Sequence, residues 1–262
     1  MNYKLTLQYD GTDFHGWQMQ DELRTVQSEL TAALSLIEGR AVTVHGSGRT
    51  DSGVHAEGQV ASVVLEREIT PAKLRAAING NVDKDLRVID IEVVDDDFHA
   101  RYSATGKTYV YRIIKGPVSS PFWSRYAHHD ARTFDLAQMI SGSHLFTGKH
   151  DWTAFSAAKS DVEDRVRTIT GIAVTETVDS RACAGMIEIA VSANGFLRYM
   201  VRTIAGTLMA LGRGEVSEVQ ISAAIETGQR HTAFVTAPAC GLTLVSVEYP
   251  ESSTAAAQRL LS

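Results

Sequence analysis

The feature that most constrains this chain is a repeated alternation between strands of period two and amphipathic helices. The stretch 3–9 reads YKLTLQY, apolar or aromatic at every second residue, which predicts a half-buried strand. The stretch 25–39 then has apolar residues at helical spacing, with Thr25 as a candidate cap and Gly39 at its end. Further strands are predicted at 41–45, 59–65, 86–94, 109–114, 166–177, 186–191 and 242–249, and further helices at 71–78, 134–140, 196–211 and 217–226. This order favours an α+β fold with a mostly antiparallel central sheet and helices packed on one side.

The predicted elements recur in a loosely similar order in the second half, which indicates two similar subdomains. We place an N-terminal α/β subdomain at 1–105 and a C-terminal α/β subdomain at 106–250, followed by a loose tail at 251–262. No Pro-rich linker separates the halves, so two subdomains that share one sheet are favoured over two free domains.

The overall charge argues mildly against a nucleic acid as partner. The formal net charge is −6, whereas RNA binding needs a cationic surface. The acidic residues are concentrated in the stretches 90–97 and 161–164, however, so local basic surface can exist elsewhere.

Several features predict a cytoplasmic protein without a membrane segment. The two cysteines, Cys183 and Cys240, form no C-x-x-C pair, so a structural zinc site or a disulfide framework is not expected. The first strand carries Lys4 and Asp10 and does not resemble a signal peptide. No apolar run approaches the about 18 residues of a membrane span.

The loop at 45–55, HGSGRTDSGVH, holds the densest group of reactive side chains. Three glycines fall within 46–53, which predicts tight backbone turns and close approach by another segment. An arginine, an aspartate and two histidines accompany them. Polar residues on a loop between two strands are where binding and catalytic sites tend to be built. An incidental charge pair on a surface turn is the alternative.

Two known loop chemistries fit this stretch poorly. A phosphate-binding loop requires G-x-x-x-x-G-K-[ST] and a dinucleotide fingerprint requires G-x-G-x-x-G, but GSGRTD at 46–51 ends in an acid that repels phosphate. The DSG at 51–53 matches the aspartic-protease triplet, but that chemistry needs two carboxylates and no second triplet occurs. Only a homodimer could supply the missing carboxylate.

Two chemistries remain for Asp51. A metal site is conceivable from His45, Asp51, His55 and Glu57, but their spacing matches no metal motif. The other hypothesis is a single ionised aspartate that attacks an electrophilic carbon. Arg49 suits that role, because a nearby cation keeps a carboxylate charged.

The segment GRTDSGVHA at 48–56 closely resembles the G-R-T-D-[AS]-G-V-H-A motif of the tRNA pseudouridine synthase A family. Other segments resemble further family motifs in the same order along the chain. They are YDG at 9–11 with GWQ at 16–18, DFHARYSA at 97–104, KTYVYR at 107–112, HDWTAF at 150–155, NGFLRYMVR at 194–202 and APACGL at 237–242. The resemblance therefore covers nearly the whole chain and implies the pseudouridine synthase core.

The resemblance implies a homodimeric enzyme, without cofactor or metal, that isomerises uridine to pseudouridine at positions 38, 39 and 40 of the tRNA anticodon stem-loop. Asp51 would be the catalytic nucleophile. Tyr109 would pack against the target base, and Arg202 would pair with Asp51. Arg49 would help to extrude the flipped nucleotide, and Leu242 would line the pocket.

The remaining candidates concern RNA binding. Tyr109 and Tyr111 fall on one face of a predicted strand, where they can stack on a base or simply pack in the core. Arg198 and Arg202 are four residues apart, which predicts one helix face, either functional or merely solvated. A non-catalytic RNA-binding module is the competing class of function. Candidate phosphate contacts are Lys4, Arg24, Arg101, Lys107, Lys115, Arg198 and Arg213.

Overall fold

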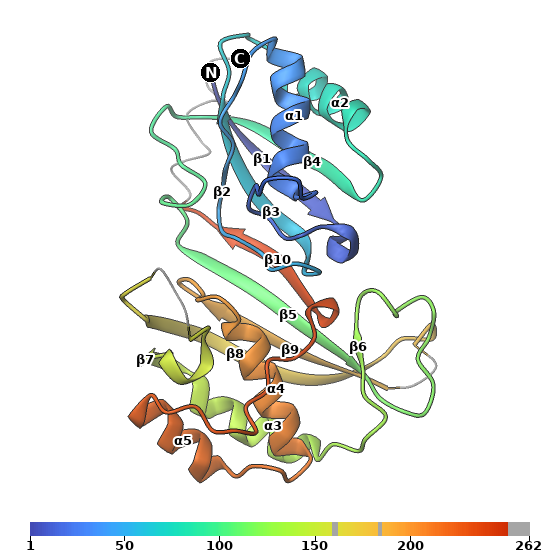
Figure 1. Cartoon of the computed structure of the whole chain (residues 1–262), viewed down its shortest axis with the longest axis vertical. Coiled ribbons are helices and arrows are strands. Elements are labelled where there is room, and N and C mark those ends of the chain that lie inside the picture. The colour runs from blue at the N-terminus through green and yellow to red at the C-terminus, as the bar shows by residue number, and fades with distance from the viewer. Residues whose placement is uncertain (159–161, 183–184, 251–262) are drawn as a thin grey trace. The chain divides into compact units, whose positions relative to one another are not determined.

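The computed structural model describes residues 1–158, 162–182 and 185–250 (Figure 1). The predicted loose tail at 251–262 and Cys183 lie outside the described residues. The chain forms two compact units. The first contains Met1–Gly106 together with residues 244–250, and the second contains the described residues of Lys107–Thr243.

The first unit is a sheet covered by two helices. In chain order its elements are β1 (Asn2–Tyr9), α1 (Val26–Glu38), β2 (His45–Gly46), β3 (His55–Val64), α2 (Pro71–Asn81), β4 (Leu86–Val94) and the greater part of β10 (Leu242–Glu248). The strands lie in the order β4-β1-β3-β10, and β1 pairs antiparallel with both β3 and β4. Helices α1 and α2 lie on the same face of this sheet (Figure 1).

Local sequence explains why α1 begins and ends where it does. The Thr25 hydroxyl accepts the Ser28 N–H at 3.2 Å, and the Ser28 hydroxyl accepts the Thr25 N–H at 3.1 Å, a reciprocal cap. Gly39 ends the helix in the left-handed region, at φ 81°, where a side chain would be strained. Between these ends the apolar stripe of Leu30 and Leu34 is fully buried, which anchors the helix by the hydrophobic effect.

The second unit is a sheet with three helices on one face (Figure 1). Its elements are β5 (Gly106–Ile114), β6 (His128–His129), α3 (Leu136–Ser143), β7 (Gly148–Asp151), β8 (Val166–Val178), β9 (Gly185–Ala193), α4 (Met200–Gly212) and α5 (Glu218–Thr227). The strands lie in the order β5-β9-β8-β7 with antiparallel pairing, and the short β6 runs parallel to β5. The core beneath the helices contains a cluster of buried aromatic side chains: Phe146, Trp152, Phe155 and Phe234.

The predicted α+β class with mostly antiparallel strands is confirmed, but several elements differ from the predicted ones. The short strands β6 and β7 were not predicted, and β3 begins at His55, before the strand predicted at 59–65. The strand expected at 41–45 is limited to β2, at His45–Gly46. The helix expected from 196 begins at Met200, because Tyr199 adopts a left-handed backbone with φ 66°.

Another difference concerns β10. The sequence predicts that the whole of 106–250 belongs to the second subdomain, whereas β10 from Leu244 belongs to the first unit. The Thr105 N–H donates to the Glu248 carbonyl at 2.9 Å, and the Tyr249 hydroxyl donates to the Ala100 carbonyl at 2.6 Å. The strand thereby satisfies backbone groups of the first unit that would otherwise lack partners.

Candidate functional site

The loop that carries Asp51 joins β2 to β3 and is held by backbone hydrogen bonds to the segment that follows β1. The Trp17 N–H donates to the Thr50 carbonyl at 3.1 Å, and the Gly53 N–H donates to the Phe14 carbonyl at 3.3 Å. Within the loop, the Val54 N–H donates to the Asp51 carbonyl at 3.1 Å. The backbone on both sides of Asp51 is therefore fixed by main-chain contacts.

Gly16 makes this close packing possible. Its φ is +87°, a conformation that an L side chain rarely adopts, and a Cβ placed there would lie 2.7 Å from the Thr50 carbonyl oxygen. The same Cβ would lie 3.2 Å from the carbonyl carbon of Asp51. The glycine in the segment GWQ at 16–18 thus has a physical reason, since the two backbones touch directly.

A network of hydrogen bonds among uncharged groups connects the loop to β1 and β3. The Tyr9 hydroxyl and Thr50 Oγ1 are 2.9 Å apart, and Gln59 Nε2 donates to the Gly48 carbonyl at 3.1 Å. The Ser47 hydroxyl donates to Gln59 Oε1 at 2.7 Å. Burial raises the pKa of Tyr9 to about 12, so the phenol keeps its proton at neutral pH. This network fixes the loop's shape and adds no charge.

The two charged residues of the loop differ in exposure. The Asp51 residue is partly buried, whereas Arg49 is exposed. Within the described ranges 1–158, 162–182 and 185–250 we find no ion pair to the Arg49 guanidinium. Arg49 therefore presents its charge to solvent two positions from the carboxylate.

The two histidines at the ends of the stretch 45–55 each contact another segment of the first unit. His55 is buried, and its Nδ1 accepts the Gly11 N–H at 3.0 Å while lying 3.3 Å from Asp10 Oδ1. An Nδ1 that accepts a hydrogen bond carries no proton. We therefore interpret the approach of His55 to Asp10 as part of the structure of this turn and not as an ion pair. His45 is exposed and packs its ring on that of His99 at 4.7 Å. Among the described residues no group of three or more His, Cys, Asp or Glu side chains could hold a metal ion.

In the second unit, the structure places Tyr109 and Tyr111 on one face of β5. Tyr109 is 7% exposed, and its ring lies perpendicular to the Phe196 ring with the two centroids 5.2 Å apart. Tyr111 is fully buried, and its hydroxyl donates to the Pro238 carbonyl at 3.0 Å. Tyr111 is therefore a core residue beneath the segment that leads to Leu242, which is itself 5% exposed.

Arg202 lies in the first turn of α4, where two contacts orient its guanidinium. Its Nε donates to the Ala237 carbonyl at 2.7 Å, and its head lies 5.2 Å from the centre of the Tyr199 ring. Arg198 packs against the same ring at 4.7 Å. The predicted shared helix face is wrong, because α4 begins at Met200; instead both arginines converge on Tyr199.

Sequence reasoning missed Tyr199. Its left-handed φ of 66° is uncommon for a residue with a side chain, and such strain is often found at functional sites. The sequence does contain an indication of this contact, because an aromatic residue stands between two arginines in RYMVR, at 198–202. Cation–π contact on one ring holds both guanidinium groups in place.

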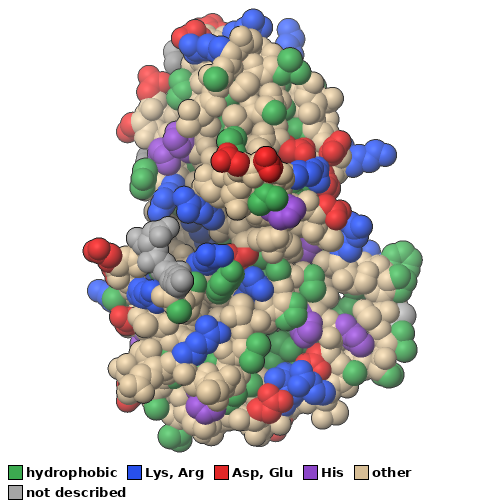
Figure 2. Space-filling view, in the orientation of Figure 1, with side chains coloured by type: hydrophobic (Ala, Val, Ile, Leu, Met, Phe, Trp, Pro, Cys, Tyr) green, Lys and Arg blue, Asp and Glu red, His purple; other side chains and the backbone are tan. Residues whose placement is uncertain are grey.

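Several predicted phosphate contacts are already engaged by carboxylates. Acidic and basic side chains are interspersed over the face shown in Figure 2. Lys4 pairs with Glu92 at 3.1 Å. Lys115 pairs with Glu176 at 2.5 Å, and Arg213 with Glu215 at 2.7 Å. These pairs offset the positive charge that RNA would need.

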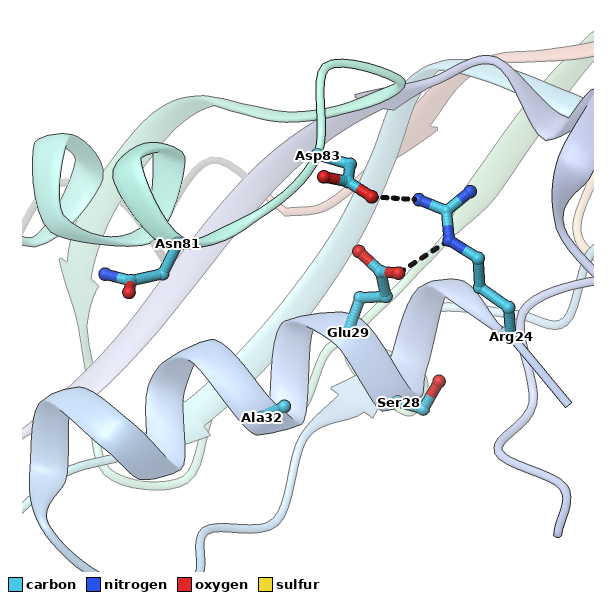
Figure 3. A pocket seen from close by; sticks show the side chains of 6 residues that line it. All are labelled: Arg24, Ser28, Glu29, Ala32, Asn81 and Asp83. Atoms are coloured by element: carbon cyan, nitrogen blue, oxygen red, sulfur yellow. Dashed lines mark hydrogen bonds and ion pairs between the residues drawn. The ribbon is translucent and has the colours of Figure 1, made fainter. Parts of the chain in front are cut away.

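Arg24 is a predicted phosphate contact whose guanidinium is surrounded by carboxylates. Its guanidinium lies 2.6 Å from Asp85, 2.6 Å from Glu29 and 3.4 Å from Asp83, beside a shallow open pocket next to α1 (Figure 3). The hydrogen bond to Asp85 is the main reason that the pKa of Arg24 is raised. Three carboxylates around one guanidinium make this surface unsuited to phosphate.

The remaining RNA-binding candidates differ in accessibility. Arg101 and Arg198 are exposed, whereas Lys107 is partly buried. Arg101 lies 5.7 Å from the ring of the exposed Tyr102. Among the described residues, no helix is both long enough and apolar enough to cross a bilayer.

Comparison with known proteins agrees with the family resemblance that the sequence motifs indicate. The sequence model of the family described as tRNA pseudouridine synthase matches residues 6–103 and 143–250. The chain is 40% identical over 251 residues to tRNA pseudouridine synthase A of Methylacidiphilum infernorum, covering 95% of this chain and 96% of that protein. It is 41% identical over 250 residues to tRNA pseudouridine synthase A of Streptococcus equi subsp. equi (95% and 99% covered). It is 42% identical over 246 residues to tRNA pseudouridine synthase A of Ruminiclostridium cellulolyticum (94% and 98% covered).

Proposed function

The chain belongs to the tRNA pseudouridine synthase A family, and from that premise we propose that Asp51 is the nucleophile that converts uridine to pseudouridine at positions 38, 39 and 40 of the tRNA anticodon stem-loop. The observation that carries the proposal is the fixed backbone of the Asp51 loop. Hydrogen bonds from Trp17 and Gly53 and the close approach of Gly16 hold this loop in one position. A nucleophile must be positioned to within a fraction of an ångström, and such a loop provides that.

The reaction itself requires one ionised carboxylate. The bond from ribose C1′ to uracil N1 breaks, the base rotates, and C5 then bonds to C1′. Attack on C1′, attack on C6 and assistance to a glycal intermediate all use the same carboxylate of Asp51. C5 loses its proton and N1 takes one up, so the isomerisation balances and no co-substrate is consumed.

We propose that Arg202 pairs with Asp51 and keeps it ionised. Burying a carboxylate costs several kcal/mol unless a cation compensates for the lost hydration. The bond from Arg202 to Ala237 and the packing on Tyr199 orient the guanidinium before substrate arrives. A guanidinium oriented in advance loses less side-chain entropy when it forms a pair.

The other predicted site residues take part in holding the flipped nucleotide. Flipping a base out of a helix costs on the order of a few kcal/mol, and stacking on an aromatic ring returns roughly 1–3 kcal/mol. We propose that Tyr109, supported edge-on by Phe196, provides this ring. Leu242 would line the apolar side of the pocket. Arg49, exposed beside Asp51, would occupy the space that the nucleotide leaves.

The resemblance to the family also supports two further proposals, that the chain acts as a homodimer and that it works in the cytoplasm. Light scattering on the purified protein tests the first of these. A monomeric mass at the concentrations used for the enzyme assay would exclude the dimer.

The decisive experiment measures tritium release from tRNA that carries 5-tritiated uridine. We expect wild type to release tritium and Asp51→Asn to release none, because the amide has the same shape but cannot act as a nucleophile. Asp51→Asn should still bind tRNA and should unfold at a similar temperature. Ser52→Ala, at the exposed neighbouring position, is the matched control and should retain activity.

Three outcomes would contradict the proposal. Full release by Asp51→Asn would show that another group is the nucleophile. RNA binding without release by wild type would favour the non-catalytic RNA-binding module. Peptide cleavage at acid pH without response to RNA would favour a dimeric aspartic protease.

A further inference from the structure

A ladder of three aromatic rings lies on the surface of the first unit, where the turn that follows β4 meets His45 of β2. The rings of His45 and His99 have centroids 4.7 Å apart, and those of His99 and Tyr102 are 4.4 Å apart. Tyr102 closes the ladder with 77% of its surface exposed, and the Arg101 guanidinium lies 5.7 Å from its ring. We call these four residues the Tyr102 ladder.

The turn that carries the ladder is rigidly attached to the sheet. The Asn2 side-chain amide donates to the Phe98 carbonyl at 2.9 Å, and the Ala100 N–H donates to the Ser62 hydroxyl at 3.1 Å. The Ser103 N–H closes the turn on the His99 carbonyl at 2.9 Å. Tyr102 is therefore held in its exposed position by its own backbone, which is unusual for so large an apolar ring.

Hydrogen bonds also fix the state of the central ring. His99 Nδ1 accepts the N–H groups of Arg101 and Tyr102 at 3.1 and 3.4 Å, so the proton of the neutral ring is on Nε2. Burial and the adjacent His45 lower the pKa of His99, and Arg101 lowers it further. At neutral pH the ladder thus presents a flat uncharged ring between two others.

We propose that the Tyr102 ladder is a stacking site for an unpaired nucleotide of the RNA substrate, separate from the uridine that reacts. This proposal rests on the proposed function. Exposed aromatic rings beside an arginine are the side chains that bind splayed-out bases, and they accept any base because every base has a flat face. His45 lies in β2, which leads directly into the loop that carries Asp51, so the ladder is connected to the proposed nucleophile through a short stretch of backbone.

One feature favours RNA over a protein partner for this surface. Asp95, Asp96 and Asp97 are exposed just before the turn, and aspartate is depleted at the centre of protein interfaces. The same carboxylates would repel a dense array of phosphates. A single unpaired base that stacks, with at most one phosphate on Arg101, fits both the rings and the acidic surroundings.

The test measures binding of a full-length tRNA transcript by fluorescence anisotropy, together with tritium release. We expect Tyr102→Ala to weaken binding by about tenfold or more, while the rate at saturating tRNA stays unchanged. Tyr102→Phe should keep wild-type affinity, since the ring remains. Phe122→Ala, which removes a ring that is 70% exposed in the second unit, is the matched control and should have no effect.

The salt dependence separates stacking from charge. Tyr102→Ala should leave the slope of log K against log salt unchanged, whereas Arg101→Ala should reduce it by about 0.7 to 0.9 for one lost phosphate contact. Unchanged affinity in Tyr102→Ala would overturn the proposal. So would a change in oligomeric mass that accompanies the loss, since the surface would then bind protein.

The outcomes also distinguish this proposal from the proposed function. If wild type binds tRNA but releases no tritium, the catalytic proposal fails and the binding comparison of Tyr102→Ala with Tyr102→Phe still decides the ladder. If wild type releases tritium and all variants bind equally, only the ladder is wrong. If wild type binds no RNA, both are wrong.

Discussion

Replacing Gly16 with alanine should move the loop that carries Asp51 without touching any side chain of the candidate site. Gly16 has φ +87°, where an L residue costs about 1–2 kcal/mol. The new Cβ would lie 2.7 Å from the Thr50 carbonyl oxygen, and an ordinary contact begins near 3.4 Å, so the loop must retreat by about 0.7 Å. That retreat acts directly on Thr50 and on its neighbour Asp51.

The expected effects follow from this displacement. The hydrogen bond from Trp17 to Thr50, now 3.1 Å, would lengthen or break, which adds about 1 kcal/mol to the strain. We therefore expect a loss of about 2–3 kcal/mol in the free energy of unfolding. A misplacement approaching 1 Å costs on the order of 100-fold in rate, so single-turnover tritium release should fall by roughly one to two orders of magnitude.

Gly80→Ala is the matched control for the same chemical change. Gly80 lies inside α2, and a Cβ there would meet nothing within 4 Å. Because alanine is the better helix former, this variant should keep full activity and gain about 0.5–1 kcal/mol in stability. Urea unfolding and single-turnover kinetics on both variants provide the comparison. Wild-type rate and stability in Gly16→Ala would refute the argument that backbone contact positions Asp51.

Two further predictions concern the second unit. The Thr153 hydroxyl and N–H donate to Asp151 at 2.5 and 2.8 Å and lower the pKa of Asp151, so this stabilisation is present above about pH 4 and lost as pH falls through the lowered value. Urea unfolding of Asp151→Asn should accordingly depend less on pH below pH 4 than that of wild type, and an equal dependence would contradict the assignment. Trp152→Phe removes the bond from the indole N–H to the Arg167 carbonyl at 2.9 Å and leaves a gap in the core, so it should cost about 2–3 kcal/mol by urea unfolding. Unchanged stability would show that phenylalanine fills this site equally well.

Local sequence was sufficient for the elements whose limits depend on neighbouring residues. The alternation at 3–9 predicted β1, and the cap at Thr25 with the terminal Gly39 predicted both ends of α1. Apolar periodicity predicted β4 to the residue. Each of these signals acts between residues a few positions apart, so the sequence alone records it.

The sequence also contained the chemistry of the candidate site. The stretch 48–56 carries Arg49 and Asp51 together with the turn residues that position them, and the ordered motifs at 97–104 and 194–202 indicated the family. These segments are informative because a candidate reacting group, its neighbours and its backbone turn are encoded next to one another.

What only the tertiary structure decided is which side chains from distant segments meet. Arg24 fits a phosphate contact by sequence, yet Asp83 and Asp85 fold back onto it and offset its charge. Tyr102 becomes part of a ladder of rings only because the turn after β4 brings His99 onto His45. Such encounters depend on strand order and on the packing of helices against the sheet. They are long-range properties that no local pattern of residues determines.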